Sequence, residues 1–124
     1  MTKTAKLLIV EDDDLNQKLY KAVLSKEFDT TFCANDVQFY AALPKKKYDI
    51  FLIDLALGKG EDGISLIKKL RQMDEYKSTP IIVVTAYAFK RDEDTAMAAG
   101  ATKFIRKPVD NKVLLNEFKK YFQL

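Results

Sequence analysis

Four short apolar runs, separated by stretches with helical spacing, constrain the fold of this chain more than any other feature. The runs are KLLIV (6–10), YDIFLID (48–54), PIIVVTA (80–86) and ATKFI (101–105). The first three are continuous rather than alternating, which is typical of strands covered on both faces in a parallel sheet. A fifth run, TTFCA (30–34), is more polar, as expected for a strand at the edge of the sheet.

Helices are predicted between and after these strands, because apolar residues recur there at helical spacing. The Ala-rich stretch AFKRDEDTAMAAG (88–100) is expected to be a helix that ends at Gly100. The apolar faces predicted for the other four helices are Leu15, Leu19, Val23 and Leu24, with Phe28 just beyond; Val37, Tyr40 and Ala41, ending before Pro44; Ile64, Ile67 and Leu70; and Leu114, Phe118 and Tyr121.

The resulting order is strand then helix, repeated five times with short connections. This pattern predicts an α/β fold, a doubly wound parallel sheet with helices on both faces. Ligands of such folds bind beyond the carboxyl ends of the strands, where the strand order reverses. For a five-stranded sheet of order 2-1-3-4-5, that crevice lies between the first and third strands, and the two weaker strands form the edges.

The amino-acid composition excludes several classes of catalytic and metal site and bears on the partners and location of the protein. The 124 residues fit a single domain, 1–124, and their net charge of +3 does not favour nucleic acid as a partner. The chain contains no histidine, which excludes Ser-His-Asp and Cys-His catalysis and histidine metal ligation. Its single cysteine, Cys33, is expected to be a buried strand residue. Without an apolar run long enough for a signal peptide or membrane span, we expect a cytoplasmic protein.

Polar residues stand at the carboxyl ends of the predicted strands. Carboxylates that converge in a partly desolvated crevice raise one another's pKa or require a cation, and Mg²⁺ prefers such oxygen ligands. A lysine and a hydroxyl beside them suit a phosphoryl group held on a carboxylate oxygen. The residues are Glu11 and Asp12 after the first strand, Asp54 after the third, Thr85 and Ala86 after the fourth, and Lys107 and Pro108 after the fifth.

Each of these residues also has a structural interpretation. An aspartate at a helix start is a common N-cap, but one cap, Asp13 or Asp14, is enough and leaves the two preceding carboxylates unexplained. Asp54 alone fits a turn, Thr85 a strand, and Lys107 a solvated surface. Their occurrence together, one group at each expected strand end, favours function over structure.

The motifs LLIVEDD, DIFLIDLALGKGEDG, PIIVVTAYA and AAGATKFIRKP, followed by an amphipathic helix, cover essentially the whole chain. In this order and spacing the chain resembles a receiver domain of two-component response regulators, similar to the chemotaxis regulator with its flavodoxin-like fold. The resemblance implies that Asp54 is the phosphoacceptor. It also implies that Glu11 and Asp12 hold Mg²⁺ together with Asp54 and the backbone carbonyl of Ala56.

The same resemblance assigns the remaining site residues. Thr85 becomes the switch hydroxyl, and Lys107 contacts the phosphoryl group through a loop whose Lys107–Pro108 bond is cis. Phe104 is expected to turn into the space that Thr85 vacates, and Ala86 and Tyr87 join these switch positions. With Ala56, Tyr87 is expected to tune the lifetime of the phosphoryl group by shielding it from water.

Partners follow from the same family. The chain lacks a histidine, so the phosphoryl donor is a partner histidine kinase or histidine phosphotransfer protein, with self-catalysed transfer from a small phosphodonor also expected. A downstream protein would bind the surface of the fourth helix, fifth strand and fifth helix. The domain itself is expected to be a monomer or a phosphorylation-dependent dimer. The residues expected on that surface are Lys90, Arg91, Phe104, Arg106 and Lys112.

One departure and two alternatives stay open. The stretch LGKGEDG has Gly58 where the family usually has a proline, and an inserted residue before the next glycine. The first alternative is a phosphohydrolase, but Ala56 stands where such enzymes carry a second aspartate. The second is a degenerate receiver that acts as a phosphorylation-independent docking module. The sequence leaves open whether the domain stands alone or belongs to a hybrid kinase or larger regulator.

Overall fold

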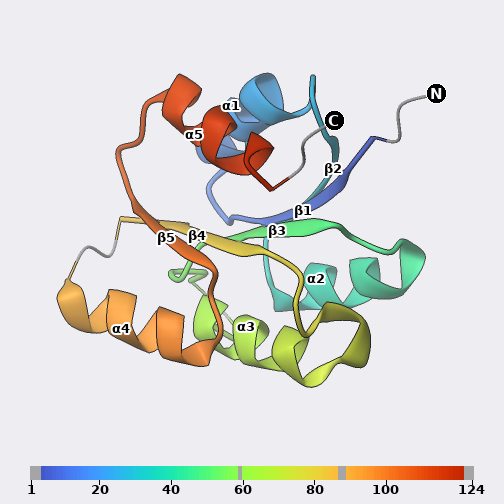
Figure 1. The fold of residues 1–124 in the computed structure, drawn as a ribbon, viewed down its shortest axis with the longest axis vertical. Helices are drawn as coiled ribbons and strands as arrows, with labels where there is room; N and C mark the ends of the chain where they lie inside the picture. Colours follow the sequence, from blue (N-terminus) through green and yellow to red (C-terminus); the bar gives the residue numbers. More distant parts are fainter. Residues whose placement is uncertain (1–3, 59, 87–88, 122–124) are drawn as a thin grey trace.

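The computed structural model describes residues 4–58, 60–86 and 89–121. Five strands form one parallel sheet in the order β2-β1-β3-β4-β5, so the predicted fold and strand order are confirmed (Figure 1). The strands are β1 (Lys6–Val10), β2 (Asp29–Cys33), β3 (Ile50–Ile53), β4 (Ile81–Thr85) and β5 (Lys103–Arg106). The helices are α1 (Asp14–Leu24), α2 (Asp36–Ala42), α3 (Gly63–Gln72), α4 (Lys90–Ala99) and α5 (Asn111–Lys119), with short 3-10 turns η1 (Leu43–Lys45) and η2 (Asp74–Tyr76).

The sheet lies between two helical layers. Helices α1 and α5 cover one face, and α2, α3 and α4 cover the other (Figure 1). Alternate residues of the central strands enter the two layers: Leu7 and Ile9 of β1 pack under α1 and α5, whereas Leu8 and Val10 pack toward α2 and α3. This alternation explains the continuous apolar runs, because a strand buried on both faces needs apolar side chains at every position. None of the described helices is long and apolar enough to cross a membrane.

The two edge strands differ from the three central ones in burial. Every residue of β3 and β4 is buried, whereas β2 and β5 are mostly half-buried or exposed, as predicted for edges. Strand β5 starts at Lys103, later than the expected 101–105. The reason is that Thr102 stays outside the strand, where its hydroxyl accepts a hydrogen bond from the Ile81 amide at 3.0 Å.

The face of α1 that packs on the sheet is rotated from the predicted one. Leu15 is 75% exposed and Leu19 is also exposed, whereas Tyr20 and Leu24 are buried. The sequence allowed this error because α1 carries more apolar residues than one contact face requires. The first two leucines therefore lie at the surface, beside the end of the sheet that holds the predicted site.

The predicted face of α2 was also wrong. Val37 is 72% exposed, and the buried residues are Phe39 and Ala42. Leu43 continues this buried face after the helix. Because α2 has only seven residues, two alternative apolar stripes are nearly equivalent in the sequence, and packing against the sheet selects the one that contains the phenylalanine.

Helix ends agree with the predicted caps. The Asp13 carboxylate accepts a hydrogen bond from the Asn16 amide at 2.9 Å, so one capping aspartate begins α1. Gly100 ends α4 with a φ of 121°, a left-handed conformation that favours glycine.

Arg71 joins the segments at the amino end of β4 and β5. Its guanidinium donates hydrogen bonds to the carbonyl oxygens of Gly100 at 2.9 Å, Tyr76 at 2.8 Å and Thr79 at 2.7 Å. It therefore ties α3 to η2 and to the loops that begin β4 and β5. These segments lie at the end of the sheet opposite the predicted site.

Candidate functional site

Two carboxylates from adjacent strands meet at the carboxyl end of the sheet. Glu11 follows β1 and is 1% exposed, and Asp54 follows β3 and is 5% exposed. The Lys107 ammonium donates to Glu11 Oε1 at 2.8 Å and to Asp54 Oδ2 at 2.9 Å. The structure thus brings together three of the predicted site residues. Lys107 is 96 positions from Glu11 and 53 positions from Asp54 in the sequence.

The backbone fixes these three residues by extending the sheet. The Asp54 amide donates to the Val10 carbonyl at 3.0 Å, and the Glu11 amide donates to the Cys33 carbonyl at 2.9 Å. The Lys107 amide donates to the Thr85 carbonyl at 2.9 Å, and the Lys107–Pro108 peptide bond is cis, as expected. The carboxylates and the lysine therefore stand on the rigid ends of buried strands rather than on a long loop.

The electrostatics of the site depend on Lys107. Burial raises the pKa of Glu11, the hydrogen bond and charge of Lys107 lower it, and the charge of Asp54 raises it further. Burial acts to lower the pKa of Lys107, but its hydrogen bonds to both carboxylates and the charge of Asp54 outweigh burial and raise it. The lysine therefore stays protonated and compensates the negative charge of two buried carboxylates.

Asp12 lies at the exposed side of the same site. A Cβ atom on Gly58 would stand 3.1 Å from Asp12 Oδ2, so this carboxylate lies against the loop that follows β3. In that loop the Ala56 amide donates to Asp54 Oδ1 at 3.1 Å. Within the part of the chain that the structure describes, no three Asp, Glu or Cys side chains already form a metal-binding cluster. The oxygen chemistry of the donors nevertheless suits a hard divalent cation, because the available ligands are carboxylates and a backbone carbonyl.

The described switch residues lie at the end of β4 and in β5. Thr85 ends β4 and is fully buried, and Ala86 after it is exposed. Phe104 in β5 is half-buried and packs against the core cluster under α2, α3 and α4. Tyr87 lies outside the described residues.

Residues 7–119 match the family described as the response regulator receiver domain. The chain belongs to this family. The predicted resemblance is thereby confirmed, and the chain is a receiver domain of two-component signal transduction.

Known proteins of similar sequence and structure agree with this assignment. The receiver domain is 29% identical to the polar-differentiation response regulator DivK of Brucella anthropi, over 93% of this chain and 94% of DivK. It superimposes with a TM-score of 0.84 on the receiver domain of the Pseudomonas aeruginosa sensor histidine kinase PA1611. The two are 27% identical, and the match covers 96% of this chain and 98% of the PA1611 domain. The PA1611 domain holds a magnesium ion in its active-site cleft. The Vibrio cholerae chemotaxis protein CheY4, 23% identical with a TM-score of 0.89 over 97% and 100% of the chains, shares the fold.

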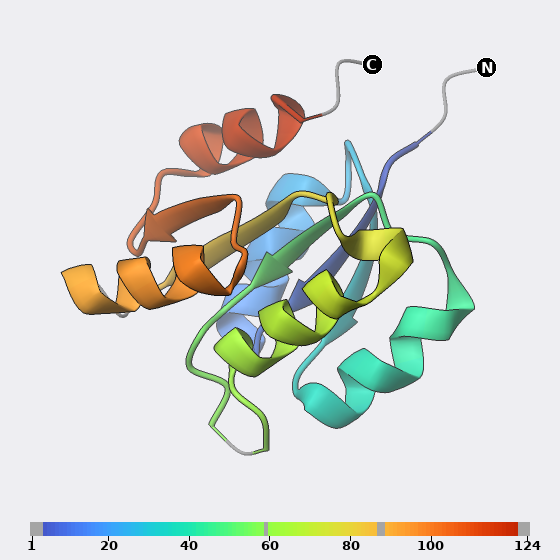
Figure 2. The ribbon, with the colours of Figure 1, turned by 60° about the horizontal axis from the view of Figure 1, so that its bottom comes forward.

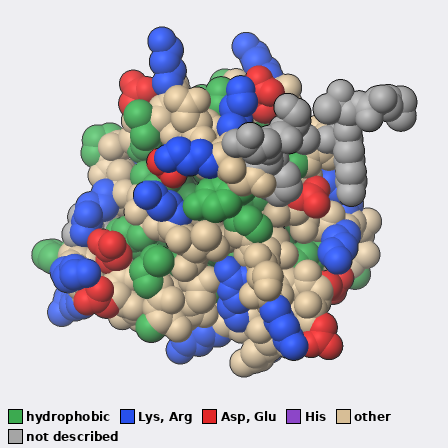
Figure 3. Space-filling model, viewed as in Figure 1, with side chains coloured by type: hydrophobic (Ala, Val, Ile, Leu, Met, Phe, Trp, Pro, Cys, Tyr) green, Lys and Arg blue, Asp and Glu red, His purple; other side chains and the backbone are tan. Residues whose placement is uncertain are grey.

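The predicted output surface of this receiver domain carries charges of both signs. Arg106 of β5 pairs with Glu93 of α4 at 2.9 Å, and its guanidinium lies 5.8 Å from the centre of the Phe104 ring. Lys90 pairs with Asp94 along α4 at 2.9 Å. Arg91 and Lys112, also expected here, are exposed. On the face shown in Figure 3, basic and acidic side chains are interspersed rather than gathered into one basic patch.

The β3–α3 loop, where the sequence departs from the family pattern, packs against α2. The Tyr40 hydroxyl of α2 donates to Glu61 Oε2 at 2.5 Å. A Cβ on Gly60 would collide with the Asp36 carboxylate, and Gly60 has a φ of 80°. The loop projects below the carboxyl end of β3 in Figure 2. Gly60 and the Tyr40–Glu61 hydrogen bond therefore fix this loop against α2.

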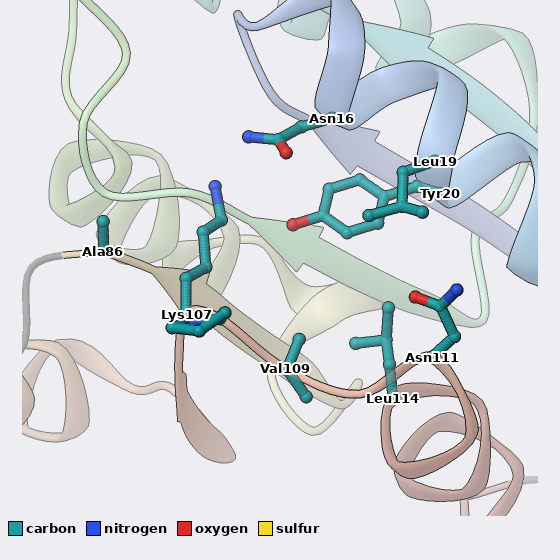
Figure 4. A pocket seen from close by; sticks show the side chains of 9 residues that line it. Asn16, Leu19, Tyr20, Ala86, Lys107, Val109, Asn111 and Leu114 are labelled. Carbon is teal, nitrogen blue, oxygen red and sulfur yellow. The ribbon is translucent and has the colours of Figure 1, made fainter.

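Two polar residues of α1 approach the site and were missed by the sequence analysis. The side-chain amide of Gln17 donates from Nε2 to the Glu11 carbonyl oxygen at 2.5 Å, and Tyr20 lines a hollow of about 310 Å³ beside Lys107 (Figure 4). The hollow lies between α1 and the segment that leads from β5 into α5. The available signal was position: six and nine residues after Glu11, these side chains return to the helix face above the strand end.

Proposed function

We propose that this receiver domain accepts a phosphoryl group on a carboxylate oxygen of Asp54 and uses it to change its binding to a downstream protein. The observation that carries the proposal is the shared ammonium of Lys107, which holds Glu11 and Asp54 together in a nearly solvent-free position. Burying a second carboxylate beside the first carries a desolvation cost that one shared lysine offsets only in part, so packing alone gives no reason for the pair. A phosphoacceptor site gives a functional reason for it.

In the proposed transfer, a deprotonated Asp54 oxygen attacks the phosphorus of a phosphohistidine on a partner kinase or phosphotransfer protein. An O–P bond forms, the N–P bond of the donor breaks, and the released imidazole takes up a proton. Lys107 can follow the new phosphoryl oxygens because its ammonium already contacts Asp54 at 2.9 Å. The positive charge of Lys107 stabilises the negative charge that develops on the phosphoryl oxygens in the transition state.

Magnesium fits this proposal through the donor chemistry of the site. Glu11, Asp12, Asp54 and the backbone carbonyl of Ala56 would hold the ion. When bound, it supplies positive charge against the phosphoryl oxygens. Lys107 occupies one oxygen of each buried carboxylate. Among the described residues, the other oxygens, Glu11 Oε2 and Asp54 Oδ1, accept hydrogen bonds from the backbone amides of Asp13 at 3.3 Å and Ala56 at 3.1 Å.

The switch would begin at Thr85, the buried last residue of β4, which is the strand that pairs with the acceptor strand β3. Movement of Thr85 toward the phosphoryl group would let Phe104 turn inward and reshape the α4, β5 and α5 surface. We propose a cytoplasmic domain spanning 1–124 that acts as a monomer or a phosphorylation-dependent dimer. The shielding role of Tyr87 stays a prediction.

The test is labelling with a small acyl phosphate or phosphoramidate in the presence of Mg²⁺, measured by intact mass. We expect one phosphate per chain, lost in Asp54→Asn and retained in Asp14→Asn, which removes an exposed carboxylate from the start of α1. A chain that stays unlabelled would act as a docking module. Continuous release of phosphate would identify a phosphohydrolase. Labelling that survives in Asp54→Asn would contradict the assigned acceptor.

A further inference from the structure

The geometry points to Tyr20 as a positioning residue that holds the Lys107 ammonium at the acceptor site through its hydroxyl. This inference rests on the proposed function and adds a residue of α1 to it. Tyr20 is 2% exposed, and its ring packs in the core cluster under α1 and α5. In Figure 4 the hydroxyl points away from that cluster and toward the Lys107 side chain.

The electrostatic surroundings of the hydroxyl place it in the same site. Burial raises the pKa of Tyr20 to about 12; the charge of Lys107 lowers it, and the charges of Glu11 and Asp54 raise it. All three charged groups of the acceptor site therefore act on this oxygen. The phenol stays protonated at neutral pH, so its oxygen can accept a hydrogen bond from an ammonium.

The donor count of Lys107 leaves room for such an acceptor. An ammonium has three N–H groups, and two are used by Glu11 and Asp54. The described residues give no acceptor for the third at hydrogen-bond distance, and Lys107 and Tyr20 line the same hollow, together with the apolar side chains of Leu19, Val109 and Leu114. An N–H of a half-buried ammonium that faces an apolar wall gains from an acceptor, and the inferred role of the Tyr20 hydroxyl is to provide it.

The ring of Tyr20 fills the core without help from its oxygen. Phenylalanine would bury the same ring among Ile9, Leu24 and Leu114, so packing alone does not call for a hydroxyl. During transfer, Lys107 has to leave its bridging position between two carboxylates and follow the phosphoryl oxygens. A hydroxyl fixed on α1 keeps the ammonium near Asp54 while its other contacts change.

The experiment is a double-mutant cycle of Tyr20→Phe and Lys107→Met, with labelling rates measured under the conditions given above. We expect Tyr20→Phe to slow labelling of Asp54 about fivefold, and to have no further effect when Lys107 is already absent. Tyr48→Phe is the matched control, because its buried hydroxyl donates to the Ala42 carbonyl at 2.9 Å in the other core layer. This control should label at the wild-type rate.

A second readout needs neither metal nor phosphodonor. Exchange of the Lys107 ammonium protons with water, followed by NMR in the metal-free protein, is expected to become about fivefold faster in Tyr20→Phe and to stay unchanged in Tyr48→Phe. This measurement requires no Lys107 variant, so it decides the contact even if Lys107→Met fails to fold.

The outcomes separate the two claims. Equal labelling and exchange in Tyr20→Phe and wild type would overturn the inference, as would a Tyr20→Phe defect of the same size with and without Lys107, because that defect would be structural. If the wild type is never labelled, the proposed function fails. The exchange measurement then still tests whether Tyr20 holds Lys107.

Discussion

Gly63, the first residue of α3, lies directly behind the acceptor residue. A Cβ atom at this position would stand 2.8 Å from Leu55 Cα and 3.0 Å from the carbonyl carbon of Asp54. It would be closer still to the backbone carbonyl oxygen of Asp54. The Gly63 amide also donates to the Leu55 carbonyl at 3.2 Å. We therefore predict that Gly63→Ala destabilises the domain and displaces Asp54.

Two opposing effects set the magnitude. Helix propensity favours alanine over glycine by up to about 1 kcal/mol, and the backbone of Gly63 does not have the positive φ that would exclude alanine. The new methyl group meets backbone atoms of Asp54 and Leu55, which cannot turn away as a side chain can. Overpacking of this kind costs about 1–3 kcal/mol. Since Gly63 is at the first helical position, where the propensity gain is smallest, we expect a net loss of about 2 kcal/mol in the free energy of unfolding.

Urea unfolding measures this loss directly. With a typical slope of about 2 kcal/mol per molar urea, the midpoint should fall by about 1 M. Because small displacements of reacting groups are expensive, labelling of Asp54 should slow by about tenfold or more. Ser65→Ala, an exposed substitution in the first turns of the same helix, is the control and should leave both values nearly unchanged. An unfolding midpoint for Gly63→Ala at or above that of the wild type would refute the steric argument.

Two further predictions concern stability away from the acceptor. Arg71→Met should lower the free energy of unfolding by about 3 kcal/mol, because it leaves the carbonyls of Gly100, Tyr76 and Thr79 without their donor. Arg71→Lys should recover less than half of this lost stability. A loss below about 1 kcal/mol for Arg71→Met in urea unfolding would contradict the interpretation. Burial raises the pKa of Cys33 from 9.0 to about 11. The stability contributed by the protonated thiol is therefore present below pH 9 and lost as the pH rises through 11. Relative to Cys33→Ala, the wild type should lose roughly 2 kcal/mol over that range; parallel pH profiles of the two proteins would count against this.

Much of the fold could be predicted from the sequence because its signals are local. Continuous apolar runs such as KLLIV and PIIVVTA mark strands buried on both faces, and the more polar runs became the edges β2 and β5. The cap at Asp13 and the helix end at Gly100 were also correct, since each depends on the chemistry of a single residue and its neighbours. The helix faces were harder: the exposed positions of Leu15 and Val37 show that surplus apolar residues leave the orientation of a helix undecided.

The candidate site was likewise predictable from the sequence only in part. The sequence by itself determined that carboxylates, a hydroxyl and a lysine follow the strands, because parallel strands end at one edge of the sheet. Only the tertiary structure showed that Lys107 bridges Glu11 and Asp54, that the Tyr20 hydroxyl faces this lysine, and that Gly63 lies against the Asp54 backbone. These contacts join residues far apart in the chain. Their distances depend on how helices pack on the sheet, which no local pattern of residues records.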